Sequence, residues 1–210
     1  MYLNIDLKRL GLFLLFLFLI LLLLGHYKFF LRSIYPFFYR DAVYQQARRY
    51  SLDPHLVAAI IYVESKFNSY ATSSQGARGL MQIMPPTARD LGIKDVTDPV
   101  DNIRGGTRYL KQMWNRWEEI PDSVQRMKFT LASYNCGYGH VKDAQNLAAK
   151  HGEDPKNWDE SVKKYLLKLS YPEYYNDEVV RYGYARGIEP VTYVKQIMAR
   201  YEHYRELIPS

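Results

Sequence analysis

Residues 10–24 form an unbroken apolar run near the N-terminus. Such a run is typical of a membrane span or of the apolar core of a signal peptide. A bilayer span needs about 20 residues, and extension to Leu31 supplies that length if His26 and Lys28 turn their polar ends toward the interface. We therefore expect residues 1–34 to form an N-terminal signal anchor, or transmembrane segment, with its linker.

A cleaved signal peptide is the alternative, because the apolar core also has about the right length for one. No small-x-small cleavage site follows the run, and no Cys is placed for lipid attachment. An uncleaved anchor is therefore favoured. Lys8 and Arg9 precede the run and Arg32 follows it, so positive charge flanks both ends and does not fix the orientation.

The rest of the chain, residues 35–210, is long enough for one globular domain with its own core. The net charge of +6 and the pI of about 9.2 suit an anionic partner, such as a membrane surface or an acidic wall polymer. Lys and Arg are scattered, with no dense basic run and no nucleic-acid motif. Nucleic acid is therefore not expected as a partner.

From residue 35 onward, the apolar spacing is mostly helical, and Asp, Ser and Pro stand where helices begin. Residues 66–78 are instead polar and rich in Ser, Ala and Gly, which predicts a loop or short irregular strands. The helices are expected at 39–50, 54–65, from Pro85 or Pro86 to about 92, from Pro99, from Asp122 or Ser123, and at 141–150, 158–169 and 191–207.

Glu64 lies at the end of the apolar pattern of residues 54–65, for which Asp53 is a plausible N-cap and Pro54 a suitable first residue. It continues a helical face that would be buried. Burial disfavours a charged carboxylate and raises its pKa. An acid that stays protonated near neutral pH is what cleavage of a glycosidic bond requires. The other members of this face are Val57, Ile60 and Ile61.

Three ordered segments resemble the catalytic domain of lytic transglycosylases, the lysozyme-like enzymes that cut bacterial peptidoglycan. They are Glu64-Ser65, the Gly-Leu-Met-Gln-containing segment 76–85, and the Ala-Ser-Tyr-Asn segment 132–137. The resemblance covers about residues 38–205. It implies a mainly α, lysozyme-like α+β fold, in which one globular helical domain at 35–210 follows the anchor.

The C-terminal third adds detail to this resemblance. Segments 174–177 and 182–194 are similar to the tail of the membrane-bound lytic transglycosylase F group. That group often carries a solute-binding module ahead of the catalytic domain. Here only the anchor and a short linker precede it, so we expect a pared-down relative without the properties of that module.

The resemblance implies a mechanism with one acid. Between Glu64 and Gln82 there is no Asp and no other Glu. Glu64 would protonate the glycosidic oxygen and then act as base on the 6-hydroxyl of the sugar, closing a 1,6-anhydro ring without water, while the N-acetyl group of the substrate stabilises the cation. A goose-type lysozyme is the alternative, and it needs a water-activating acid such as Asp98 or Asp101. A second alternative is a catalytically inactive wall-binding scaffold. The presence of Glu64 disfavours it, because a binding module has no need for a buried acid.

The same resemblance implies the substrate contacts. Ser73 lies where the family has a Ser that touches the N-acetyl sugar, although an ordinary loop Ser is an equal alternative. Tyr134 would line the cleft and help to hold Glu64 or the sugar, and Tyr193 would hydrogen-bond Glu64 from the C-terminal helix. The full set expected to bind substrate is Ser73, Gln82, Met84, Tyr134 and Tyr193.

Neighbours of these residues are expected to have structural roles. Leu80, Met81 and Ile83 should belong to the core, and Gly76 and Gly79 should permit a tight backbone path. Asn135, beside Tyr134, is also expected to be structural.

The chain implies no cofactor, because its five scattered His residues and single Cys have no metal-ligand spacing. Cys136 is the only cysteine, so the chain cannot form an internal disulfide. A thiol–imidazole pair with His140 is possible, but a small residue packed in a turn is the commoner case. The expected partners are peptidoglycan glycan strands and, through the anchor, a membrane. We expect a monomer whose catalytic domain lies in the periplasm or cell-wall space.

Overall fold

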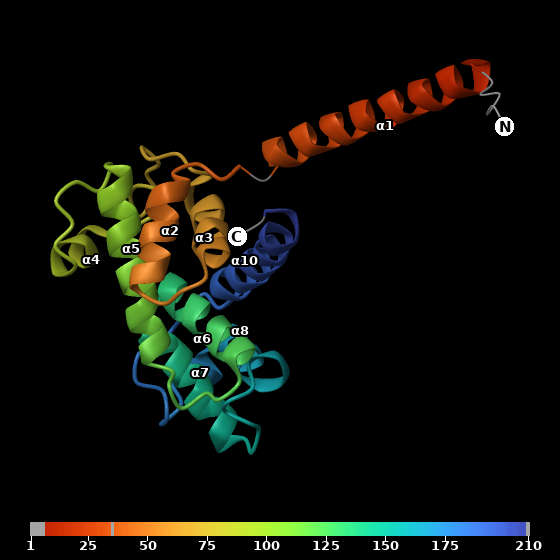
Figure 1. Cartoon of the computed structure of the whole chain (residues 1–210). Coiled ribbons are helices and arrows are strands. Elements are labelled where there is room, and N and C mark those ends of the chain that lie inside the picture. Colours follow the sequence, from red (N-terminus) through yellow and green to blue (C-terminus); the bar gives the residue numbers. More distant parts are fainter. Residues whose placement is uncertain (1–6, 35, 209–210) are drawn as a thin grey trace. The chain divides into compact units, whose positions relative to one another are not determined.

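The computed structural model describes residues 7–34 and 36–208. The chain divides into two compact units, Met1–Phe38 and Tyr39–Ser210. The described part of the first unit contains helix α1 (Leu7–Ile34), labelled in Figure 1. Its stretch Arg9–Tyr27 has 19 residues, is apolar enough to cross a membrane by length and composition, and has no part buried. At 1.5 Å per residue it extends roughly 28 Å, close to the thickness of a bilayer core.

The extension predicted beyond the apolar run is helical as well, since α1 continues past Leu31 to Ile34. His26 hydrogen-bonds the carbonyl oxygen of Leu22, one turn earlier, at 2.9 Å. The predicted reorientation of Lys28 toward an interface lies outside the side chains that the structure describes.

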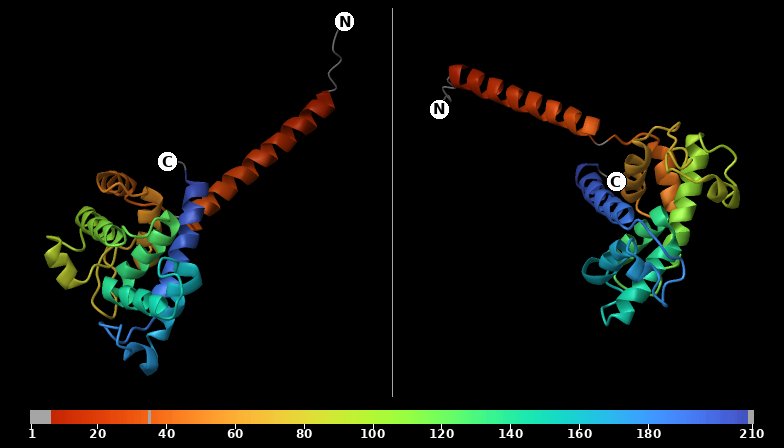
Figure 2. Two further views of the ribbon diagram at one scale, coloured as in Figure 1. Left: turned by 90° about the horizontal axis from the view of Figure 1, so that it is seen from below. Right: turned by 180° about the vertical axis from the view of Figure 1, so that it is seen from behind.

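The second unit is built from helices joined by loops (Figures 1 and 2), which confirms the prediction of a mainly helical domain. The predicted helices are present within about three residues of their expected starts. The short α9 was not predicted, and the segment expected at 158–169 begins as a π-helical turn. The elements are α2 (Arg40–Arg49), α3 (Pro54–Ser65), α4 (Pro85–Asp90), α5 (Pro99–Asn115), α6 (Ser123–Cys136), α7 (Tyr138–Lys150), η1 (Trp158–Val162), α8 (Lys163–Lys168), α9 (Pro172–Tyr175) and α10 (Ile188–Leu207).

Helix α3 is the central element of the core. Helices α2 and α10 both pack against it, and α6 packs against α10 and α5. The sequence predicted one buried stripe, but every residue from His55 to Ile61 is buried. The single-stripe prediction was therefore too narrow, because α3 has protein on several sides. Full burial of each Ile contributes roughly 1.5–3 kcal/mol.

Two tyrosines of α10 fix its register on α3. Tyr201 donates a hydrogen bond at 2.7 Å to Asp53, which also caps α3 by accepting from the His55 backbone N–H at 2.8 Å. Two turns earlier on α10, Tyr193 donates to Glu64 at the other end of α3 at 2.5 Å. The two helices are thus joined at both ends of α3, and the second of these contacts is the predicted bond to Glu64.

Candidate active site

Glu64 stands in the last turn of α3, directly before an abrupt change of backbone direction. Lys66 and Phe67 both adopt left-handed backbone conformations, with φ of 52° and 63°. Such conformations cost of order 1–3 kcal/mol in residues with a side chain and gather at functional sites. The strained backbone that ends α3 therefore lies where the helix places the Glu64 carboxyl group beside a loop.

The pKa of Glu64 is suited to general acid catalysis. Burial raises the pKa of its carboxyl group to about 7, and the hydrogen bond from Tyr193 opposes that rise. The residue as a whole is only half-buried, so a ligand can reach it. Near neutral pH, the group is divided between the acid form, which can give a proton, and the base form, which can take one.

Tyr134 and Tyr193 enclose this carboxyl group. Burial is the main cause that raises the pKa of both phenols well above the ordinary value, and the charge of Glu64 adds to it. Both hydroxyls therefore stay neutral donors. However, Tyr134 donates to the backbone oxygen of Met81 at 2.8 Å. Tyr134 was predicted to help hold Glu64 or the sugar. Its hydroxyl instead holds the loop that follows α3, and its contact with the sugar stays a prediction.

Asn102, which the sequence analysis did not single out, organises the loop that carries Gln82. It is fully buried one turn into α5. Its side-chain oxygen accepts from the Met81 backbone N–H at 2.8 Å, and its amide nitrogen donates to the carbonyls of Arg78 at 3.1 Å and Val96 at 2.8 Å. The sequence signal for this role was an Asn beside apolar residues early in the α5 pattern. It did not reveal the partners of Asn102, because they lie elsewhere in the sequence.

Glycine is required where this loop passes Asn102. Gly79 has a φ of +80°, and a Cβ there would lie 2.1 Å from the Asn102 side chain and 2.2 Å from the Val96 carbonyl oxygen. Gly76 also has a positive φ, of +88°. The prediction that these glycines permit a tight backbone path is confirmed, as is the burial of Leu80, Met81 and Ile83.

Gln82 and Met84, two of the predicted substrate contacts, lie on the same loop but differ in how their side chains are bonded and exposed. Gln82 has a left-handed backbone, with a φ of 46°, and its amide nitrogen donates to the carbonyls of Ala71 at 3.1 Å and Gly79 at 2.9 Å. Both amide hydrogens are thus used internally, which leaves the amide oxygen for a ligand. Met84 is 40% exposed where α4 begins, and is free to contact one.

Ser73 has a structural explanation. Its hydroxyl oxygen accepts from the Ala77 backbone N–H at 2.9 Å, and its own N–H donates to the Ala77 carbonyl at the same distance. These bonds close the turn that connects Thr72 with Arg78. Thr72 and Arg78 form one isolated bridge, and Arg78 and Ile83 form another, which is the irregular strand pairing expected here. Asn135 is exposed, so its expected structural role is not supported.

The acids that a hydrolytic mechanism needs are used elsewhere. Asp98 caps α5 by accepting from the Asp101 backbone N–H at 2.7 Å, and Asp101 pairs with Arg104 at 2.9 Å. The pKa of Glu64 responds to burial and to Tyr193, and neither of these is a second carboxylate.

Other chemistries have little support in the described part of the chain. Among residues 7–34 and 36–208 there is no group of three His, Cys, Asp or Glu side chains that could hold a metal ion. Burial raises the pKa of the Cys136 thiol to about 12, so the thiolate is scarce at neutral pH. The Cys136 sulfur contacts the Gly137 carbonyl oxygen rather than His140.

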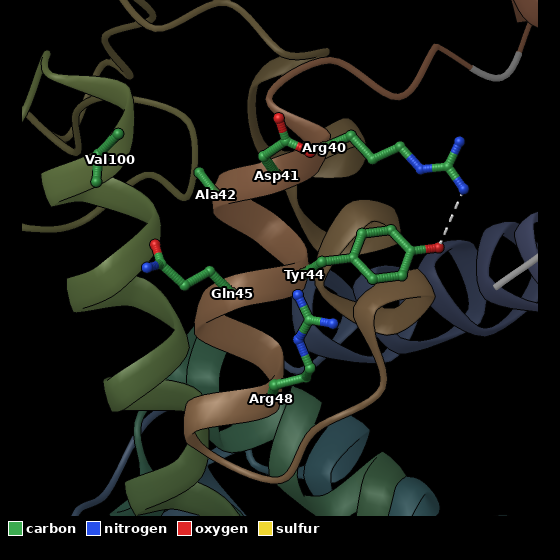
Figure 3. A pocket seen from close by; sticks show the side chains of 7 residues that line it. All are labelled: Arg40, Asp41, Ala42, Tyr44, Gln45, Arg48 and Val100. Atoms are coloured by element: carbon green, nitrogen blue, oxygen red, sulfur yellow. Dashed lines mark hydrogen bonds between the residues drawn. The ribbon is translucent and has the colours of Figure 1, made fainter.

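The surface of this unit includes two grooves of interest. One, of about 660 Å³, lies between α2 and the start of α5. Figure 3 shows Ala42 and Gln45 directed toward Val100 across it, while Arg40 extends to the Tyr44 hydroxyl. None of the predicted site residues, Glu64, Ser73, Gln82, Met84, Tyr134 and Tyr193, lines this groove. The other, of about 810 Å³, includes Tyr109, whose ring centre lies 5.2 Å from that of Tyr134. The second groove therefore adjoins the candidate site.

Replacing Tyr193 should move the pH dependence of any activity that needs protonated Glu64. Because the Tyr193 hydroxyl lowers the pKa of Glu64, Tyr193→Phe should raise that pKa and shift the alkaline limb of the pH–rate profile upward. The rate at the optimum should fall by no more than about ten-fold, the equivalent of one hydrogen bond. Tyr201→Phe, which loses the bond to Asp53 on the same helix, is the matched control. A profile that shifts equally in both variants would contradict this role for Tyr193.

Comparison with known proteins gives consistent similarities. The family model described as Transglycosylase SLT domain matches residues 41–157. The chain is 43% identical over 164 residues to "Membrane-bound lytic murein transglycosylase F" of Desulfosudis oleivorans, covering 78% of this chain and 36% of that protein. It is 46% identical over 153 residues to the protein of the same name from Vibrio cholerae, covering 71% and 28%. The chain thus spans about a third of the length of these relatives.

Solved structures support the fold. The 70 kDa soluble lytic transglycosylase from Escherichia coli superposes with a TM-score of 0.59 at 23% identity, over 86% of this chain and 26% of that one. A complex of the 70 kDa soluble lytic transglycosylase with bulgecin A gives a TM-score of 0.60 at 22% identity, over 86% and 26%. The lysozyme-like fold expected from the sequence is thereby confirmed.

Proposed function

Because this chain belongs to the transglycosylase SLT domain family, we propose that it is a peptidoglycan lytic transglycosylase. It cleaves the β-1,4 bond between N-acetylmuramic acid and N-acetylglucosamine without water and leaves 1,6-anhydro ends. The observation that carries this proposal is the pKa of Glu64, about 7, in a half-buried position beside the Gln82 loop. The names of the similar proteins agree with it.

In the proposed reaction, Glu64 acts twice. Protonated Glu64 gives its proton to the glycosidic oxygen as the bond to the muramic acid breaks. The carboxylate that results then takes the proton of the 6-hydroxyl, whose oxygen attacks the anomeric carbon and closes the anhydro ring. The Tyr193 hydroxyl steadies the carboxylate between the two steps by donating to it at 2.5 Å. The proton returns to Glu64, so the enzyme ends as it began.

The contacts to substrate are proposed from the same site. Met84 and the amide oxygen of Gln82 face the ligand, and Tyr134 and Tyr193 enclose the acid. Ser73 contributes a turn, in which its hydroxyl can still donate to an N-acetyl oxygen while it accepts from Ala77. Hydrolysis by a goose-type mechanism is disfavoured, because Asp98 caps α5 and Asp101 forms an ion pair with Arg104.

The reaction type is tested by the mass of the products. Digestion of purified peptidoglycan by the full chain should release muropeptides one water lighter than hydrolysis products, with no new reducing ends. Both quantities are measured by mass spectrometry after chromatographic separation, with a hydrolytic lysozyme digest as the reference. Products that carry reducing muramic acid would instead assign the chain to the goose-type lysozymes.

We also propose how the chain is organised in the cell. Residues 1–34 anchor residues 35–210 in a membrane, with the catalytic domain in the periplasm or cell-wall space, where its substrate lies. The apolar stretch Arg9–Tyr27 supports the anchor, although a cleaved signal sequence would look the same. We also propose that the chain acts as a monomer. Protease digestion of spheroplasts tests the placement, because a domain that resists cleavage until lysis would be on the wrong side.

A further inference from the structure

The groove beside Tyr109 has lining residues that the proposed reaction does not use. It is enclosed by the ends of α4 and α5, the start of α7 and the segment around Tyr182. Two routes connect it with the catalytic acid. Tyr109 packs on Tyr134, which encloses Glu64. Helix α4 begins after Met84 and contributes Thr87 and Asp90 to the groove wall.

One wall of the groove carries an exposed guanidinium beside an aromatic ring. Arg116 lies 5.0 Å from the ring centre of Tyr138, and its positive charge opposes the rise that burial produces in the pKa of Tyr109 and of Tyr138. Asp90 lies on the α4 wall of the same groove. Within the described residues, neither Arg116 nor Asp90 forms an ion pair. The groove thus offers both an unpaired cation and an unpaired anion.

Tyr182 forms an aromatic platform that is fixed in place although 61% of it is exposed. Its backbone N–H and that of Arg181 donate to the buried Asp143 carboxylate, at 2.7 Å and 2.9 Å. Its ring lies so close to Gly139 that a Cβ there would be 2.4 Å from it. An exposed ring that is pre-positioned by buried bonds is suited to ligand binding, because little further ordering is needed.

We propose that this groove binds the stem peptide of the muramic acid next to the cleaved bond, with Arg116 pairing with a carboxylate of that peptide. The inference rests on the proposed function and names the part of the substrate that the second groove reads. Neutral N-acetylated sugars do not require charges of opposite sign, whereas a peptide with free carboxylate and amino groups complements both. A guanidinium is the side chain best suited to a carboxylate, because it donates two parallel hydrogen bonds. An extended peptide advances about 3.3–3.6 Å per residue, so a stem of a few residues is long enough to enter a groove that adjoins the site.

The test compares two substrates: peptidoglycan strands that carry their stem peptides, and the same strands stripped by an amidase that cuts between muramic acid and peptide. With the full chain, Arg116→Gln should lower cleavage of the peptide-bearing strands by about 5- to 10-fold, the effect of one partly exposed charged hydrogen bond. Cleavage of the stripped strands, whose only carboxylate is the lactyl group that the amidase frees beside the sugar ring, should be unchanged. Arg108→Gln is the matched control, since Arg108 is exposed on α5 and does not line the groove.

Two results would overturn the stem-peptide proposal: no loss on either substrate, or an equal loss on both, which would mean that the groove holds sugar. A binding measurement separates this proposal from the proposed function. In the Glu64→Gln background, sedimentation with insoluble peptide-bearing strands should be weakened by Arg116→Gln, and sedimentation with stripped strands should not. If the parent cleaves neither substrate but this binding difference persists, the reaction is wrong and the peptide site stands. Binding that Arg116→Gln leaves unchanged rules the site out.

Discussion

Glu64→Gln is expected to reduce cleavage of peptidoglycan by ~10²–10⁴-fold, because Gln cannot give or take the proton that both steps require. Gln has nearly the shape of protonated Glu and still accepts the hydrogen bond from Tyr193, so the fold should be retained. The measurement is the rate of release of soluble muropeptides at pH 6–7. Glu118→Gln, a change of the same kind at an exposed acid, should keep full activity. Full activity in Glu64→Gln would contradict the assignment of the catalytic acid.

The same variant has a stability signature that distinguishes lost chemistry from misfolding. The pKa of Glu64 is 4.5 in a model peptide and about 7 in the fold. Between these pH values the folded chain binds more protons than the unfolded chain, so the contribution of Glu64 to stability is fully present below pH 4.5 and is lost as the pH rises through 7. Glu64→Gln removes this dependence. The melting temperature of Glu64→Gln minus that of the parent should therefore increase from pH 5 to pH 8, although the variant has lost activity.

Asn102→Ala is expected to lower the free energy of unfolding by about 3–5 kcal/mol. The change leaves the buried Met81 N–H without its partner, which costs about 1–3 kcal/mol, and removes the part-buried bonds to the carbonyls of Val96 and of Arg78, which still accepts from Ile83. It also opens a cavity beside Gly79. Denaturant unfolding, followed by circular dichroism, measures the loss.

The matched control for this change is Asn146→Ala. Asn146 is only partly buried and donates one longer hydrogen bond, 3.3 Å, to the Val179 carbonyl, so its loss should cost about 1 kcal/mol or less. The two variants therefore compare the same chemical change at a fully bonded site and at a weakly bonded one. Equal stability losses would mean that Asn102 does not organise the Gln82 loop.

Local features of the sequence were enough to predict most of the helices. Asp53 and Pro54 start α3, and Asp98 with Pro99 starts α5, because capping and the fixed φ of Pro act within a few residues. The burial of α3 on several sides was not predicted, since the number of helices packed around it is a property of the assembled core. The short α9 was missed, because four residues are too few to set up a periodic pattern.

The candidate site divides in the same way. Order and spacing pointed to Glu64, and the resemblance added the contact between Glu64 and Tyr193, which the structure contains. The inward bonds of Gln82, the bond from Tyr134 to Met81 and the role of Asn102 did not follow from either. The bonds from Gln82 to Ala71, from Tyr134 to Met81 and between Asn102 and Met81 each join residues at least 11 positions apart in the chain, so no local pattern reports them.

What the sequence by itself determined was an apolar N-terminal segment, a helical domain, and an acid at the end of an apolar helix, because these depend on side chains that are neighbours along the chain. Only the tertiary structure decided what that acid can do. Its pKa of about 7 arises from burial against the surrounding structure and from a tyrosine 129 residues away in the chain. The groove that reaches Arg116 likewise exists only where α4, α5 and α7 meet. Desolvation and charge act through space, and folding alone brings those groups together.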